Sequence, residues 1–334
     1  MTRALISAIA LVLLLTGCGT KKQYFEPEQT AGAVSFDGSI PSEIVEVTRY
    51  GATLKNGQII TSKGVSSVTM PEGFNFLGEF DHRLIAVADC GDLKVLNETG
   101  TVLFEKKFPR AIASASISGD LLAVVSSGNR LSMLNMQSGE VVFDKKQDDV
   151  YALDSRMAAP YFLSGLVLFP TLDGKVVIID KKSGQIIRDV VISSERYFNN
   201  VIFLDVLGDR LVAATAKRVI SINPKTTVFL DADVKDVILL ENRVFVFTKD
   251  GRILLTDADL KVLKERKFLF ATFSGAIHGE FVYVVEKNGY MIATDLDLIT
   301  TNIYELPSDI DAKMFTTNDT IYFDDRYFKL NAAK

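Results

Sequence analysis

Short runs of apolar residues alternate with polar turns along the chain from about residue 50 to its end. The recurring unit is an apolar strand, a polar turn, a second apolar strand and another turn, as in "RLIAVADCGDLKVLNETG" (83–100) and "NRVFVFTKDGRILLTDADL" (242–260). Asn-Gly or Asp-Gly lies at several hairpin tips and supplies the positive φ that such turns need. Eight copies are visible, and their first strands begin near Thr53, Leu84, Leu121, Leu166, Leu211, Val244, Phe281 and Ile321. The pattern therefore predicts an all-β protein.

The spacing of the copies indicates which all-β architecture to expect. Successive copies start 31 to 45 residues apart, which fits four short strands in each unit of a β-propeller. We predict eight four-stranded blades over residues 31–334, or seven if residues 43–70 divide differently. Apolar runs before the hairpins, such as 201–206 and 236–240, are expected as innermost strands. The last copy is one strand short, and the segment 31–36 is the expected closing strand.

The N-terminal sequence "MTRALISAIALVLLLTGC" has the layout of a secretory signal, with Arg3 ahead of an apolar run. As a helix, the apolar run Ala4–Leu15 would span only about 18 Å, short of a roughly 30 Å hydrocarbon core. We therefore expect a signal peptide at 1–17 and, because "GTKKQYFEPEQTAG" has no helical or strand period, a flexible tether at 18–30.

The segment "LTGC", which ends at Cys18, resembles the lipobox of bacterial lipoproteins. The resemblance implies cleavage before Cys18 and attachment of acyl chains to its thiol. The alternative is an ordinary signal peptide that happens to contain a cysteine. In such lipoproteins an Asp directly after the Cys favours retention in the inner membrane, and this chain has Gly19 there. The resemblance therefore implies that the protein is anchored at the periplasmic face of the outer membrane, with the periplasmic face of the inner membrane as the alternative.

Charge and cysteine content narrow the function classes. Without residues 1–17 the chain has 36 basic and 42 acidic side chains, a formal charge of −6, which disfavours binding to nucleic acid. If Cys18 carries lipid, Cys90 has no partner within the chain, and we expect it to be a buried or half-buried unreactive thiol.

Two segments, "MLNMQSGEVVF" (133–143) and "IIDKKSGQIIR" (178–188), resemble the repeat of quinoprotein-type propellers, although the Trp of that repeat is missing and the chain has no Trp. The layout of a lipobox followed by a propeller of this size resembles the BamB family of lipoproteins, which assist the outer-membrane β-barrel assembly machinery. The quinone pocket of the quinoproteins uses adjacent cysteines, a Trp and calcium, so we expect no cofactor here.

No residue pattern indicates catalysis, and we expect no enzyme. His82 and His278 precede strands of blades that are not neighbours, so turn positions are expected rather than metal ligands. The carboxylate pairs at 231–236, 257–261 and 295–298 lack the further ligands and Gly of a calcium loop and are expected as solvated turn residues.

Two consecutive connections between blades, 145–162 and 192–200, are longer than the others and should lie side by side on one rim. They carry residue types enriched in protein interfaces, namely Tyr151, Arg156, Met157, Arg196, Tyr197 and Phe198. We predict a partner-binding surface there; the alternative is that the connections only cover blade edges.

The predicted function is an outer-membrane-anchored scaffold that binds envelope proteins, including the β-barrel assembly machinery. The alternative is an enzyme or small-ligand receptor that uses the central channel. Convergent polar groups in the channel would favour the alternative, and an apolar plug would favour the scaffold.

Overall fold

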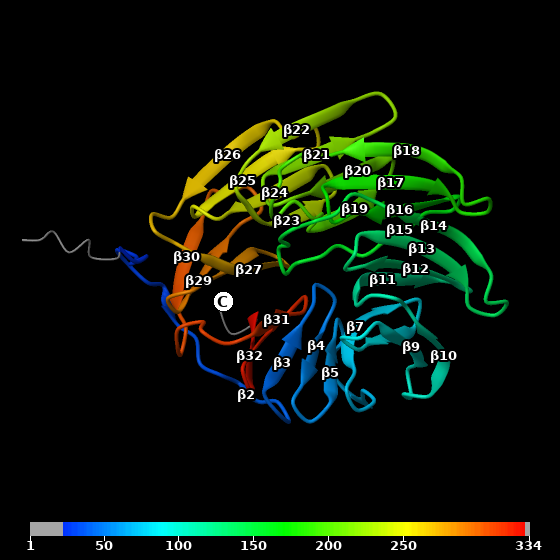
Figure 1. The fold of residues 1–334 in the computed structure, drawn as a ribbon. Coiled ribbons are helices and arrows are strands. Elements are labelled where there is room, and N and C mark those ends of the chain that lie inside the picture. Colours follow the sequence, from blue (N-terminus) through cyan, green and yellow to red (C-terminus); the bar gives the residue numbers. More distant parts are fainter. Residues whose placement is uncertain (1–22, 331–334) are drawn as a thin grey trace, which may run out of the picture.

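Eight antiparallel sheets are arranged around a common centre in the computed structural model, which describes residues 23–330 (Figure 1). The prediction of an eight-bladed β-propeller is therefore confirmed, and within the described residues every regular element is a strand apart from a single 3₁₀ position at Leu330. In blades 1 to 6 four strands follow one another in sequence order from the centre outward, and N-terminal strands are added to the outer edges of blades 7 and 8. First strands of neighbouring blades contact one another, for example β7 with β11 and β19 with β23.

Blade 1 contains β3 (Ile44–Val47), β4 (Ala52–Leu54), β5 (Gln58–Thr61) and β6 (Gly64–Thr69), and blade 2 contains β7 (Asn75–Phe80), β8 (Arg83–Val87), β9 (Asp92–Asn97) and β10 (Val102–Lys107). Blade 3 contains β11 (Ile112–Ser118), β12 (Leu121–Ser126), β13 (Arg130–Asn135) and β14 (Val141–Lys146), and blade 4 contains β15 (Tyr161–Phe162), β16 (Leu166–Pro170), β17 (Lys175–Asp180) and β18 (Ile186–Val191).

Blade 5 contains β19 (Phe203–Leu207), β20 (Arg210–Ala214), β21 (Arg218–Ile222) and β22 (Thr227–Asp231), and blade 6 contains β23 (Val234–Leu240), β24 (Arg243–Thr248), β25 (Arg252–Asp257) and β26 (Val262–Lys267). Blade 7 contains β27 (Phe273–His278), β28 (Val282–Glu286), β29 (Tyr290–Thr294) and β30 (Thr301–Glu305). Blade 8 contains β31 (Met314–Thr316), β32 (Thr320–Phe323) and β33 (Arg326–Lys329) and is completed by β2 (Gly38–Ser39).

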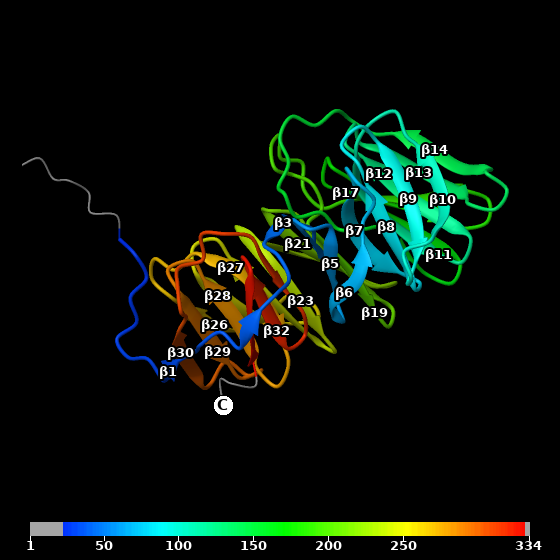
Figure 2. The same ribbon diagram turned by 90° about the horizontal axis from the view of Figure 1, so that it is seen from below.

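An N-terminal strand closes the ring, but the predicted segment 31–36 is not that strand. The fourth strand of blade 8 is β2, which pairs with β33. Within 31–36, β1 (Gly32–Ala33) adds in parallel to β30 as a fifth strand of blade 7 (Figure 2). Between β1 and β2 the chain crosses from blade 7 to blade 8. Val34, on this crossing segment, is buried in the apolar cluster that the two blades share.

The apolar core lies largely between neighbouring blades. One cluster joins Val95 of blade 2 to Leu122 and Val124 of blade 3. Phe143 occupies a position at which the quinoprotein repeat has Trp, and its ring lies 5.6 Å from that of Phe169 in the next blade. A Phe–Phe contact thus fills the space between blades 3 and 4 without a Trp.

A polar side chain at or just after the end of the third strand orders the next turn in six blades. Its oxygen accepts a backbone N–H from two or three residues further along the chain, an Asx turn. The six residues are Asn97, Asn135, Asp180, Asn223, Asp257 and Asp295. The predicted turn carboxylates Asp257 and Asp295 therefore hold backbone, which explains why Asp or Asn recurs in the repeat.

Candidate functional site

The two long connections, 147–160 between β14 and β15 and 192–202 between β18 and β19, contact each other. The backbone N–H of Phe198 donates to the Ala152 carbonyl oxygen over 2.9 Å. The buried Asn200 side chain accepts from the Asp154 N–H over 2.7 Å. In an antiparallel four-stranded blade, the connections to the next blade share an edge with the hairpins between second and third strands. We call this edge of the ring the connection rim.

Four side chains of these connections form an exposed cluster, which we call the aromatic patch: Tyr151, Arg196, Tyr197 and Phe198. The Tyr151 and Tyr197 rings lie 6.3 Å apart, and the Arg196 guanidinium lies 5.3 Å and 5.4 Å from their centres. Tyr151 is 70% exposed, and Tyr197 and Phe198 are about half exposed. Aromatic rings held in place by a cation offer contact area at little entropic cost.

A cavity of about 260 Å³ lies beside the patch. Tyr151 and Arg196 form part of its wall, together with charged side chains of both signs. The other charged residues of the wall are Asp148, Asp149, Asp173, Lys175 and Glu195. The cavity and the exposed rings together form a surface suited to an aromatic or charged side chain of another protein.

Arg156 and Met157, which the sequence grouped with the patch, lie in the central channel instead. The guanidinium of Arg156 donates to both carboxylate oxygens of Asp154, over 2.8 Å and 2.6 Å. Met157 lines a central cavity and packs against the core of blades 3 and 4. The chain turns inward here because the amide of Asn200 donates to the carbonyl oxygens of Asp154 and Arg156.

The turn between β3 and β4 crosses the central channel, which sequence reasoning missed. Arg49 Nη1 donates to Asp236 Oδ1 and to the Ile202 carbonyl oxygen, both over 3.1 Å. The hydroxyl of Tyr50 accepts from the backbone N–H of Ala159 over 2.7 Å. These contacts join blade 1 to blades 4, 5 and 6. The sequence signal was a pair of large polar residues at a hairpin turn otherwise made of small ones, "TRYG" (48–51).

Burial and charge pairing perturb the groups of this crossing. Burial opposes the charge of Arg49, but Asp236, together with Tyr50 and Asp205, more than offsets it, and the pKa of Arg49 is raised. Burial raises the pKa of Tyr50 and of Asp205. Burial, reinforced by Arg156, lowers the pKa of Lys235.

Three cavities adjoin the turn that crosses the channel. Residues of the crossing turn line three cavities of about 450, 510 and 610 Å³. The side chains that cross the channel are polar, so among the described residues the channel is not filled by an apolar plug. Most of these polar groups form hydrogen bonds with one another. The exception is Arg156 Nη1, which is buried without a hydrogen-bond partner among the described residues.

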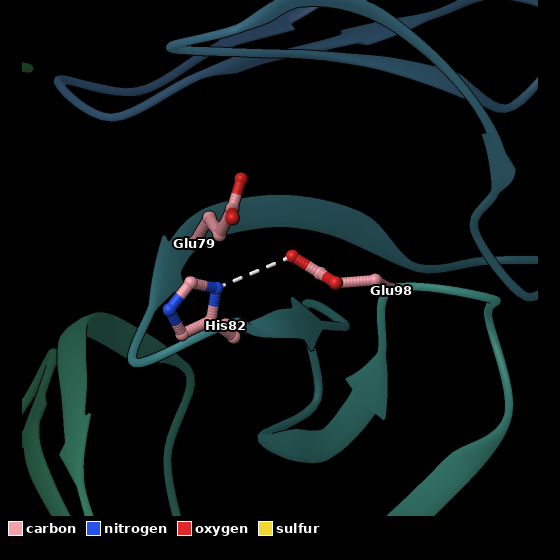
Figure 3. Close-up of side chains that lie close together, drawn as sticks. All are labelled: Glu79, His82 and Glu98. Carbon is pink, nitrogen blue, oxygen red and sulfur yellow. Dashed lines mark hydrogen bonds and ion pairs between the residues drawn. The ribbon is translucent and has the colours of Figure 1, made fainter.

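Within residues 23–330, three potential metal ligands lie close together, Glu79, His82 and Glu98 (Figure 3). His82 Nδ1 lies 3.4 Å from Glu98 Oε1. However, the Lys63 ammonium donates to Glu79 Oε1 over 2.6 Å and lies 3.4 Å from Glu98 Oε1. Hydrogen bonds from His82 and Lys63 lower the pKa of Glu98. Lys63 thus supplies the positive charge that a metal would bring, and the group is an ion-pair cluster between blades 1 and 2.

Cys18 and residues 19–22 of the predicted tether lie outside the described residues. The described part of that tether is not free along its whole length, because Phe25 is buried against Phe268 and Tyr290, with ring centres 6.1 Å and 5.6 Å apart. Cys90 is exposed, which corrects the expected burial, and its thiol donates to Asp92 over 2.8 Å. In the described part of the chain no helix is long and apolar enough to cross a membrane.

Comparisons with known proteins agree with this architecture. The family described as outer membrane protein assembly factor BamB matches residues 55–298. Two proteins named plasminogen-binding protein PgbB, from two Helicobacter pylori strains, are each 30% identical over 99% of this chain and 71% of their own length.

Solved structures with the same fold are more distant in sequence. BamB from Moraxella catarrhalis superposes with a TM-score of 0.65 at 15% identity, over 88% of this chain and 96% of that one. The C-terminal WD40 domain of Sif2 gives 0.68 at 12% identity, over 90% and 99%.

Proposed function

Because the chain belongs to the family of the outer membrane protein assembly factor BamB, we propose that it is a scaffold that binds other envelope proteins through the aromatic patch. The proposed partner is a component of the outer-membrane β-barrel assembly machinery, and no catalysis is part of this role. The observation that carries the proposal is the exposed Tyr151–Arg196–Tyr197 cluster on two connections that are longer than those of other blades.

A partner that binds the aromatic patch would cover its Tyr rings and the Arg196 guanidinium. Tyr and Arg are the residues most often found at the energetic centre of interfaces, where truncation costs about 2 kcal/mol or more. Here the rings and the guanidinium are already in contact, so little side-chain freedom is left to lose on binding. The neighbouring cavity can take one side chain of the partner.

The test is co-purification of native partners from solubilised membranes with the Arg196→Ala/Tyr197→Ala variant. We expect capture of the main partner to fall at least 30-fold, as a loss of about 2 kcal/mol implies. The matched control is Arg218→Ala/Phe229→Ala, which removes another exposed Arg–aromatic pair, 5.4 Å apart on blade 5. Equal capture by both variants, with unchanged melting temperatures, would contradict the proposal.

We further propose that Cys18 carries the lipid that anchors the scaffold at the periplasmic face of the outer membrane. Two acyl chains give stable anchoring where one is marginal. We expect Cys18→Ala to move the protein from the membrane fraction to the soluble fraction while the propeller keeps its melting temperature. Mass spectrometry of the mature N-terminus that showed an unmodified Cys18 would refute the anchor.

A second candidate partner is plasminogen. The relatives named plasminogen-binding proteins align with almost the whole of this chain at 30% identity. Surface plasmon resonance with purified plasminogen tests this role, and the Arg196→Ala/Tyr197→Ala variant shows whether the aromatic patch is the surface used. No binding at micromolar plasminogen would exclude it.

A third candidate is a small-ligand receptor in the channel. The unpaired Nη1 of Arg156 favours an anionic ligand. Titration calorimetry with citrate is a direct probe, and binding that Arg156→Gln abolishes would support this role over the scaffold.

A further inference from the structure

The connection between β26 and β27 exposes two large apolar side chains at the tip of a tight turn. The turn spans 268–271 and is closed by a hydrogen bond from the Ala271 N–H to the Phe268 carbonyl oxygen over 3.1 Å. Leu269 is 63% exposed and Phe270 is 49% exposed. Phe270 has a φ of 64°, a left-handed conformation that is unfavourable for a bulky residue. The fold therefore holds these side chains in solvent at some energetic cost.

The equivalent turns of other blades show that the fold does not require apolar residues here. In five connections the first residue donates its N–H to the carbonyl oxygen of the glycine at the tip of the preceding hairpin. The pairs are Met70 with Gly57, Phe108 with Gly91, Ile192 with Gly174, Leu306 with Gly289, and Phe268 with Gly251. In three of them a proline and a polar residue follow, namely Pro71–Glu72, Pro109–Arg110 and Pro307–Ser308. Another continues with Ser193–Ser194, and of the five only the connection after β26 continues with two large apolar residues, Leu269–Phe270.

The exceptional turn is the one beside which the N-terminal segment docks. Phe25 packs against Phe268, the first residue of the turn, with ring centres 6.1 Å apart, and Figure 1 shows the N-terminal segment leaving the ring near the end of β26. Tyr24, next to Phe25 in the chain, is 59% exposed. Phe25 follows Cys18 by seven positions in the chain, a reach of at most about 25 Å. If Cys18 carries lipid, as proposed above, the bilayer surface lies within that distance of the turn.

We propose that Tyr24, Leu269 and Phe270 form a membrane-contact patch that inserts into the headgroup region of the bilayer holding the anchor. Apolar and aromatic side chains partition into this region, and Tyr favours it because its ring is apolar and its hydroxyl polar. The neighbouring exposed charges are mixed, with Glu26 on the N-terminal segment and Lys287 on the adjoining hairpin. The contact should therefore depend little on salt or on the charge of the lipids.

The patch determines orientation rather than attachment. Three side chains bury too little area to hold the protein on vesicles without the acyl chains. With the anchor in place, they direct the connection rim, on which the aromatic patch also lies, toward the membrane. A partner embedded in the same membrane would then meet the aromatic patch from that side.

The absence of Trp from the chain allows a single-residue reporter. Phe270→Trp in the lipidated full-length protein is reconstituted into vesicles of phosphatidylethanolamine and phosphatidylglycerol, with and without brominated acyl chains. The matched control is Arg110→Trp, the same turn position between blades 2 and 3. We expect the Phe270→Trp emission to shift to shorter wavelength on vesicles and to lose at least half its intensity with brominated lipid, in 50 mM and 500 mM salt alike. Arg110→Trp should change by less than a tenth.

Flotation of the same samples separates this inference from the proposed anchor. Protein that floats with the vesicles but shows equal, weak quenching at both positions would overturn the membrane-contact patch and leave the anchor intact. Failure to float would refute the anchor, and the patch with it.

Discussion

Replacing Asp236 by Ala tests whether the Arg49 crossing of the channel stabilises the ring. The substitution removes the carboxylate that pairs with the Arg49 guanidinium. The Ile202 carbonyl oxygen, the Phe203 ring, whose centre lies 4.9 Å from Arg49 Cζ, and the nearby charge of Asp205 remain. Removal of one partner of a buried ion pair costs about 3–5 kcal/mol. Both side chains keep 20% exposure, so water compensates in part and we expect about 3 kcal/mol. For a domain of this size, that corresponds to about 6 °C in Tm.

The assay is urea unfolding followed by far-UV circular dichroism, for Asp236→Ala, Arg49→Met and the double variant. The double variant should be less destabilised than the sum of the single variants by about 1–3 kcal/mol, because the second change removes a charge that the first left unpaired. The control is the exposed pair Arg218–Asp231, for which we expect a coupling below about 1 kcal/mol. Strict additivity, or a cost of Asp236→Ala below about 0.5 kcal/mol, would refute the reasoning.

Three further predictions concern pH, cofactors and the N-terminal segment. Contacts from Thr248, Arg252 and Lys267 outweigh burial and lower the pKa of Asp250 to about 2, so the ionised carboxylate stabilises the fold fully above about pH 5 and this contribution is lost as the pH falls toward 2. Asp250→Asn should therefore lower the Tm at pH 7 and make the further fall of Tm between about pH 5 and 2 smaller than in the parent protein. Added pyrroloquinoline quinone with calcium should shift Tm by less than 1 °C, and a stabilisation near 2.7 kcal/mol, as expected at a hundredfold excess over Kd, would show a cofactor site. Phe25→Ala removes a buried ring and should speed hydrogen exchange and proteolysis in residues 23–34 while the Tm of the ring falls by less than 3 °C; unchanged exchange there would contradict the docking.

The periodic part of the sequence was sufficient to predict the ring. Apolar runs recur in every blade, with Gly at a hairpin tip in seven of the eight. Each copy of this pattern reflects pairing between strands that are close in sequence. The closing strand was misplaced because "AGAVSF" has the more apolar pattern, whereas β2 has two small residues and binds through its backbone. Where a short terminal strand pairs depends on which sheet edge is still open in the folded ring. The local pattern of apolar and polar residues does not encode that edge.

The candidate site was predictable to the extent that it follows from spacing. Unequal spacing placed 147–160 beside 192–202, but it could not tell which side chains point outward. Asn200 decides this by binding the carbonyl oxygens of Asp154 and Arg156, which turns Arg156 and Met157 into the channel. The Arg49–Asp236 pair joins residues 187 positions apart, and no sequence period connects them.

The central claim is that partners bind the aromatic patch, and photo-crosslinking in living cells tests it most directly. Benzoylphenylalanine is placed at Tyr197 and, as the matched site, at Phe229, which is exposed to the same degree on blade 5. The account predicts a discrete crosslinked band from position 197 that contains an outer-membrane assembly component, that is absent from position 229, and that disappears when Arg196→Ala and Tyr151→Ala are added. No crosslink at 197 beyond that at 229, in cells where the protein is in the membrane fraction, would contradict it.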